Sequence, residues 1–175
     1  MDVQLRFAVE PDAIALAAFR ERVAAEGRWI GDPADPVMGA EAWRSRLSGP
    51  HHFTIVAVAG DEVAGFASLT EAAGVGTLGM AVADGHRGRG LGGRLLDRAI
   101  EEARERGTVH KIDLGVWPHN GAAIRLYISR GFAVEGRRVR HHRRADGALW
   151  DAIKMGLVLD HSAPGSPHAD WDGAS

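Results

Sequence analysis

The stretch that decides the fold covers residues 78–106 and reads LGMAV (78–82), ADG (83–85), HRGRGLGG (86–93) and RLLDRAIEEARER (94–106). Its beginning predicts a strand, and its end predicts an amphipathic helix, because apolar residues recur there with the helical period. Four glycines and two arginines lie in between. Each glycine in a helix costs about 1 kcal/mol relative to alanine, and arginines at a helix N-terminus oppose the helix dipole. Both features are explained if a phosphate binds there to backbone N–H groups and arginine neutralises it.

The composition bounds the class of protein. A chain of 175 residues is most simply one domain; we expect it to cover residues 1–159, followed by a disordered tail at 160–175 that is rich in small and polar residues. The net charge of −2 provides no general attraction for nucleic acid or for an anionic membrane. The absence of cysteine excludes disulfides, thiolate metal ligands and a cysteine nucleophile. With no signal-peptide pattern and no long apolar segment, we expect a soluble cytoplasmic protein.

Periodicity along the chain predicts an α/β fold. Strands are expected at 3–9, 53–59, 63–69, 77–82, 111–117, 132–140 and 149–159, with a turn at 71–76. Helices are expected after Pro11, at 40–47, from the glycine-rich segment to Gly107, and after Asn120, which is a suitable N-cap. The strand–helix–strand unit at 77–117 predicts a right-handed crossover between parallel strands. The order of elements therefore predicts a central mixed sheet with helices on both faces.

Three interpretations of the glycine-rich segment compete. A nucleotide-binding P-loop is excluded, because no Gly-Lys-Ser/Thr closes the segment. A dinucleotide site is an alternative, since residues 88–93 match G-x-G-x-x-G and Asp113 follows about 20 residues later. However, Asp113 falls inside its strand rather than at the strand's carboxyl end. A plain tight turn with solvated arginines does not explain so many costly glycines.

Two motifs together resemble those of a known family. The segment Arg87-x-x-Gly90-x-Gly92 resembles the acyl-CoA pyrophosphate loop of the GNAT superfamily of N-acetyltransferases. Downstream, the pattern N-x-x-A-x-x-L-Y-x-x-x-G-F is complete at residues 120–132. Two motifs in the right order are more specific than either alone, and the chain is most similar to the phosphinothricin and ribosomal-protein acetyltransferases. The resemblance implies the acyl-CoA N-acyltransferase fold, acetyl-CoA as cosubstrate and an amine acceptor.

The resemblance also implies where coenzyme A binds. Strand residues Met80, Ala81 and Val82 would offer backbone groups to the pantetheine arm, and Asn120 would hydrogen-bond that arm. The pyrophosphate would contact the backbone N–H groups of the loop, with charge from Arg87 and Arg89. The loop residues are Gly88, Arg89, Gly90, Leu91, Gly92 and Gly93.

Acetyl transfer needs a neutral amine, a stabilised oxyanion and a proton for the leaving thiolate. Tyr127 is the only tyrosine, and its hydroxyl is suited to protonate the sulfur; periodicity alone makes it a core aromatic residue. Glu26 is a candidate general base, with Glu71, His86 or water as alternatives, because the strand before the loop lacks the glutamate that many family members place there. Without cysteine, direct attack in a ternary complex is the simple mechanism.

Other features suggest weaker sites. Nine histidines are present, but no H-E-x-x-H motif occurs, so we expect no metal. The basic run at 137–144 is typical of a solvated hairpin edge, with an acidic partner or the adenosine 3′-phosphate as alternatives. The tryptophans are expected mostly in the core, although Trp29 is also suited to line an acceptor pocket. We expect a small-molecule or peptide amine as partner, with no nucleic acid and no membrane. A homodimer is left open, as is the alternative of a non-catalytic module that binds CoA or an NAD-type dinucleotide.

Overall fold

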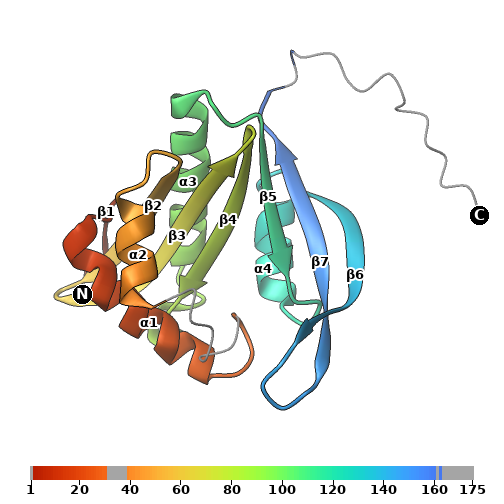
Figure 1. The fold of residues 1–175 in the computed structure, drawn as a ribbon, viewed down its shortest axis with the longest axis horizontal. Coiled ribbons are helices and arrows are strands. Elements are labelled where there is room, and N and C mark those ends of the chain that lie inside the picture. Colours follow the sequence, from red (N-terminus) through yellow and green to blue (C-terminus); the bar gives the residue numbers. More distant parts are fainter. Residues whose placement is uncertain (1, 31–38, 161, 163–175) are drawn as a thin grey trace, which may run out of the picture.

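The computed structural model describes residues 2–30, 39–160 and 162 (Figure 1). The elements follow the expected order. They are β1 (Gln4–Phe7), a 3-10 turn η1 (Glu10–Asp12), α1 (Ala13–Ala25), α2 (Ala40–Leu47), β2 (His52–Ala59), β3 (Glu62–Ala72), β4 (Val75–Val82), a 3-10 turn η3 (Asp84–His86), α3 (Leu91–Arg106), β5 (Lys111–Val116), α4 (Gly121–Ile128), β6 (Ala133–Arg143) and β7 (Leu149–Val158).

The described strands form one mixed sheet of seven strands in the order β1-β2-β3-β4-β5-β7-β6. Strands β4 and β5 are parallel, and the other neighbours are antiparallel. The parallel pair confirms the crossover predicted for residues 77–117, and α3 makes the connection (Figure 1). Helix α3 ends at Gly107, whose φ of 66° closes the helix as predicted.

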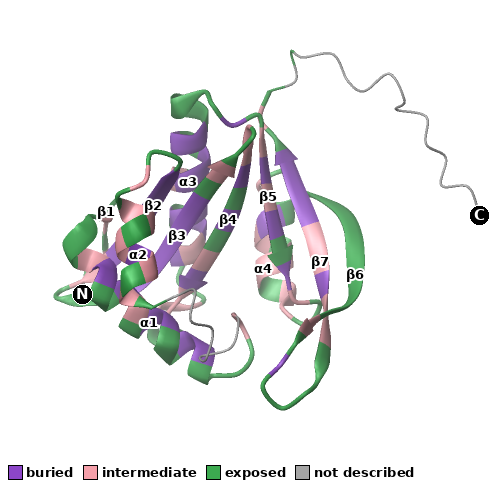
Figure 2. Cartoon of the chain, in the orientation of Figure 1, coloured by how far each residue is buried: buried purple, intermediate pink, exposed green. Residues whose placement is uncertain are grey.

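Helices cover both faces of the sheet, as expected. The larger core cluster lies under α3 and α4, where Leu95, Leu96 and Ala99 are fully buried against the central strands. The second cluster lies under α1 and α2, where Phe19 and Trp43 pack against the opposite face. In Figure 2 the buried residues accordingly concentrate along the central strands and on the inner sides of the helices.

The feature that positions the site is the short contact between β4 and β5. Their ladder pairs Val75–Thr77 with Lys111–Asp113 and extends no further among the described pairings. Beyond it, the remainder of β4 pairs only with β3, and the remainder of β5 pairs only with β7. The edge of β4 that faces β5 therefore presents backbone N–H and C=O groups that have no strand partner among the described pairings.

The structure corrects two predictions. The segment expected as a turn at 71–76 is mostly strand, because Ala73 and Gly74 alone make the turn with φ of 50° and 78°, a geometry that joins antiparallel strands directly. The tryptophans are also less buried than expected. Trp43 is in the core, but Trp29, Trp117 and Trp150 are only half-buried. The expected tail, apart from residues 160 and 162, and most of the 27–39 loop lie outside the described residues.

Within the described ranges, every helix is too short or too polar to cross a lipid bilayer.

Candidate active site

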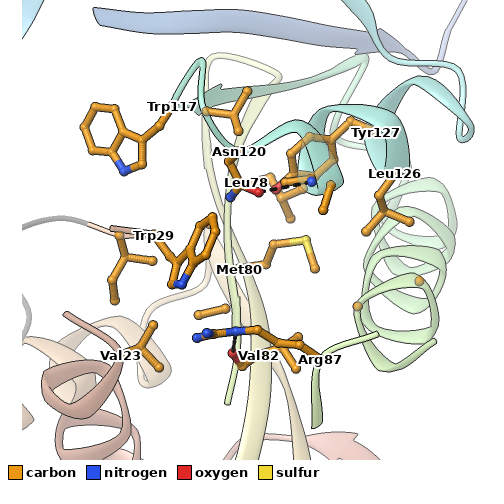
Figure 3. Close-up of a pocket in the computed structure, with 18 of the residues that line it drawn as sticks. Val23, Trp29, Leu78, Met80, Val82, Arg87, Trp117, Asn120, Leu126 and Tyr127 are labelled. Atoms are coloured by element: carbon orange, nitrogen blue, oxygen red, sulfur yellow. Dashed lines mark hydrogen bonds between the residues drawn. The ribbon is translucent and has the colours of Figure 1, made fainter. Parts of the chain in front are cut away.

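A pocket of about 530 Å³ opens where β4 and β5 separate (Figure 3). Its lining joins most of the expected cofactor residues to the end of α1, but it does not include Arg89 or Leu91. In Figure 3, Tyr127 and Leu126 lie on one side of the β4 ribbon, and Val23, Trp29 and Trp117 lie on the other. The described lining residues are Val23, Trp29, Ile30, Leu78, Gly79, Met80, Ala81, Val82, Arg87, Gly88, Gly90, Gly92, Gly93, Gly115, Val116, Trp117, Asn120, Ala122, Ala123, Leu126 and Tyr127.

The glycine-rich loop exposes backbone N–H groups at the start of α3. Gly88 and Gly90 have φ of 70° and 80°, which side-chain-bearing residues adopt only with strain. The first backbone bond of the helix runs from the Arg94 N–H to the Gly90 carbonyl, so the three preceding N–H groups, those of residues 91–93, have no partner within the helix. The first turn contains no acidic residue, and its cap is a glycine. This end of α3 is therefore suited to bind an anion.

Arg87 lies at the pocket but is held by neighbouring protein groups. Its guanidinium donates to both carboxylate oxygens of Glu26 at 2.7 Å, to Asp84 at 3.2 Å and to the Val82 carbonyl at 2.9 Å. The expected role of neutralising a phosphate therefore competes with these bonds. Arg89 is exposed on the loop, whereas Arg94 points away from the loop and donates to the Val3 carbonyl.

Tyr127 faces the pocket from the inner side of α4 and is 7% exposed. Its ring packs at 5.6 Å from the ring of Phe132, which fixes its orientation. Burial raises the pKa of the hydroxyl to about 12, because the phenolate would lose its hydration. The group therefore stays protonated and able to donate at any physiological pH.

Asn120 links the second motif to the same pocket. Its side-chain oxygen accepts the backbone N–H of Ala123 at 3.2 Å, which confirms it as the N-cap of α4. This bond fixes the amide beside the gap between β4 and β5, where its NH₂ group is suited to donate to a ligand. Met80, Ala81 and Val82 line the gap from the other side.

The three side chains predicted as candidate bases are not among the residues that line the pocket in the described part of the chain. Glu26 binds Arg87, and this hydrogen bond holds the pKa of its carboxyl below the ordinary value, so Glu26 is a weaker base than a free carboxylate. Glu71 lies near the β3–β4 turn, where it contacts His51 and the Gly74 N–H. His86 lies in η3. None of the described lining residues is an aspartate, glutamate or histidine.

Two residues that the sequence analysis did not connect with the pocket hold part of its wall. Arg144 is 8% exposed and donates to the carbonyls of Gly27 and Ile30, both at 3.2 Å. His119 contacts the Arg28 carbonyl at 2.8 Å through Nε2. Together they hold residues 27–30 against the pocket. Arg144 stands among exposed basic residues in the sequence, so no local pattern distinguishes it; His119 adjoins the second motif, which is the only available signal.

An aromatic cluster surrounds these contacts. Trp150 packs at 5.3 Å from Trp117 and at 5.0 Å from His119, and the Arg144 guanidinium lies 4.4 Å from the Trp150 ring centre. His119 in turn lies 6.1 Å from Trp29. The cluster therefore connects the β6–β7 hairpin to the wall of the pocket.

The dinucleotide alternative is not favoured by the geometry. Asp113 lies opposite Thr77 and is bound by Lys111 and Lys154 on the sheet, so it does not lie beside the pocket as a ribose ligand would. Among the described residues, no cluster of three histidine, aspartate or glutamate side chains is arranged to hold a metal ion.

The sequence of the chain matches a known family and several of its members. The model of the acetyltransferase (GNAT) family matches residues 16–132. The chain is 41% identical over 80 residues to an L-methionine sulfoximine/L-methionine sulfone acetyltransferase from Salmonella typhimurium, covering 45% of the chain and 46% of that protein. It is 34% identical over 122 residues to the N-alpha-acetyltransferase RimI of Mycobacterium tuberculosis, covering 66% and 72%. The chain thus spans about half the length of the first relative.

Solved structures agree over nearly the whole chain. The yncA protein from Salmonella typhimurium, solved with its cofactor acetyl-CoA, superposes with a TM-score of 0.81 at 26% identity, covering 95% of the chain and 99% of that structure. An acetyltransferase of the GNAT family from Streptococcus pneumoniae gives a TM-score of 0.81 at 27% identity, with coverage of 90% and 100%.

Proposed function

The chain belongs to the acetyltransferase (GNAT) family, and we propose that it transfers the acetyl group of acetyl-CoA to a primary amine of a small molecule or a peptide N-terminus. The observation that carries the proposal is the separation of β4 from β5 beside the glycine-rich start of α3. We place this activity in one domain at residues 1–159, acting in the cytoplasm, since the chain has no cysteine and thus no structural need for an oxidising compartment.

The donor side of the pocket fits coenzyme A. The N–H groups of Leu91, Gly92 and Gly93 are suited to bind its pyrophosphate, with Arg89 as the nearby exposed cation. The edge of β4 at Met80–Val82 pairs with no described strand on the β5 side, although the Val82 carbonyl accepts from Arg87. The other backbone groups of this edge and the amide of Asn120 are suited to the amide-containing arm. Gly92 lines the pocket beside Leu126 and Met80, which a Cβ built on it would contact at 3.5 Å and 3.7 Å. When bound, acetyl-CoA supplies an activated thioester.

The reaction exchanges one bond for another. The amine nitrogen bonds to the acetyl carbon as the carbon–sulfur bond breaks; the nitrogen loses a proton and the sulfur gains one. Tyr127 is the residue that we assign to protonate the sulfur, because its buried hydroxyl faces the pocket and remains protonated. A backbone N–H of Met80–Val82 is suited to stabilise the oxyanion.

The amine must reach the thioester without its proton. The described lining contains no carboxylate or imidazole, and Glu26 is held by Arg87. Entry into an apolar pocket itself disfavours an ammonium ion and lowers its pKa. We therefore assign deprotonation to desolvation of the amine with water as the proton acceptor, rather than to Glu26.

Two measurements test the proposal. Calorimetry with CoA and with NAD compares the ligands directly, and release of free thiol from acetyl-CoA, measured across a panel of amines, reports transfer. We expect CoA to bind more tightly than NAD and at least one primary amine to release thiol. Tighter binding of NAD, or tight binding of CoA with no transfer to any amine, would support the non-catalytic module instead.

A further inference from the structure

We call the part of the pocket on the α1 side of β4 its acceptor half, because the amine would bind there under the proposed function, on which this inference rests. The floor of this half is the surface of β4 and β5. Side chains alternate along β4, so Leu78, Met80 and Val82 pack with the cluster under α3 and α4, whereas Ala81 packs with the cluster under α1. Gly79 shares the α1 side with Ala81. The strand thus presents only a hydrogen and a methyl group to this half of the pocket.

Strand β5 continues the same floor. Leu114 and Val116 pack toward α3 and α4, so Gly115 between them faces the α1 side. A Cβ built on Gly115 would meet no atom within 4 Å. The floor is therefore open space rather than a close contact between backbones.

Large apolar side chains surround this floor. Val23, Trp29, Ile30 and Trp117 form its walls, and Figure 3 shows the indole of Trp29 on the same side of β4 as Trp117. A floor without side chains between aromatic and branched walls favours a bulky apolar group.

The cations beside the walls are Arg28 and Arg87, and Arg87 is paired with Glu26 and Asp84. The described lining contains no carboxylate. The guanidinium of Arg28 lies 4.7 Å from the ring centre of Trp29, and that of Arg87 lies 5.6 Å from it, so the indole already contacts two cations. A second ammonium group on an acceptor would lose its hydration among the apolar side chains of Val23, Ile30 and Trp117.

From this arrangement we infer that the acceptor is a primary amine attached to an apolar group, aromatic or branched aliphatic, and carrying no second positive charge. The apolar group lies on Gly79, Ala81 and Gly115 between Trp29 and Trp117, and the amine points through the gap toward Tyr127.

Two matched pairs of amines test the inference with the unmodified protein. We expect kcat/KM to be about tenfold or more higher for 2-phenylethylamine than for ethylamine, because even one well-buried methylene changes kcat/KM by at least about tenfold. We expect a similar excess for pentylamine over 1,5-diaminopentane, because the second ammonium group would lose its hydration in the apolar pocket. Equal or faster acetylation of the diamine, or no gain from the phenyl group, would overturn the inference.

Filling the floor provides a second test. Gly115→Val should lower kcat/KM for 2-phenylethylamine about tenfold or more, with the unfolding midpoint retained as evidence of folding. Gly136→Val is the matched control, because Gly136 also lies in a strand with no atom within 4 Å of a built Cβ, but outside the described lining. Unchanged kinetics with 2-phenylethylamine in Gly115→Val would contradict the inference.

Calorimetry of 2-phenylethylamine with the CoA-loaded protein separates the two levels of failure. Binding without acetylation supports the apolar acceptor pocket and contradicts the proposed transfer. Acetylation of amines without preference for the apolar members contradicts the pocket alone. Absence of both binding and acetylation contradicts the pocket as well.

Discussion

Tyr127 is the residue on which the proposed chemistry most depends. It is buried on α4, its ring is held by Phe132, and burial raises its pKa to about 12. A neutral phenol in this position is a hydrogen-bond donor whose proton is not lost to solvent at physiological pH. The absence of a carboxylate from the described lining makes it the ionisable group best placed to take part in proton transfer.

Replacing Tyr127 by phenylalanine isolates the hydroxyl. We expect kcat for acetyl transfer to fall about 10²-fold, the contribution of a positioned general acid, because the thiolate must then leave without a proton. The ring and its contact with Phe132 persist, so the CoA dissociation constant and the unfolding midpoint should stay near those of the wild type. An unchanged kcat would remove Tyr127 from the mechanism.

At the scale of elements, the sequence predicted the strand, loop and helix that carry the proposed donor site. The costly glycines between a strand and a helix predicted an anion site at the start of α3, which stays a prediction, and Asn120 was predicted as the N-cap of α4, which its bond to Ala123 confirms. The strand order was not predicted, because pairing between strands distant in sequence leaves no local pattern. The same reason explains why Arg144 and the aromatic cluster were missed: their contacts join residues 27–30 to a hairpin more than 100 residues later.

The glycine-rich element provides a prediction with a matched control. Gly90 and Gly107 both have positive φ and open space around a built Cβ, so replacing either by valine imposes the same backbone strain, about 1–2 kcal/mol. Gly90→Val should abolish CoA binding in calorimetry, because strain at the cap displaces the N–H groups at the start of α3. Gly107→Val lies at the far end of the helix and should retain binding. Equal CoA affinity in the two variants would defeat the assignment of the loop.

The β6–β7 hairpin, which holds residues 27–30, provides another prediction at this scale. Arg144→Met keeps the apolar stem but leaves the Gly27 and Ile30 carbonyls without a donor, at a cost of about 1–3 kcal/mol in unfolding free energy. Because Trp29 then loses its support, we expect KM for the amine to rise while CoA affinity is unchanged. Arg143→Met, which removes an exposed neighbour, should do neither. A shift in CoA affinity without a change in amine KM would contradict this role for Arg144.

At the scale of the whole molecule, the two core clusters meet at the central strands, and a polar group is buried beside one of them. His52 lies on β2, where Nδ1 contacts the Thr70 hydroxyl at 2.8 Å and Nε2 contacts the Thr54 hydroxyl at 2.9 Å. Its ring also meets Trp43 edge-on. Burial, followed by the charges of Arg46 and Arg106, lowers the pKa of His52 to about 4.

This buried imidazole predicts how stability depends on pH. Above pH 6.5, the ordinary pKa of histidine, His52 is neutral in both states. Between pH 6.5 and 4 the unfolded chain binds a proton that the folded protein does not, so stability falls with falling pH, by about 2 kcal/mol between pH 7 and 5.

Urea unfolding at pH 7, 6 and 5 measures the loss. His52→Gln should flatten the dependence, whereas His51→Gln, which alters the exposed neighbour, should retain it. Above pH 5 the carboxyl groups with lowered pKa values, Asp12, Glu26, Asp113 and Asp151 among them, remain ionised in both states and contribute little. An equal slope in His52→Gln and wild type would therefore show that this histidine does not govern the sensitivity of the fold to mild acid.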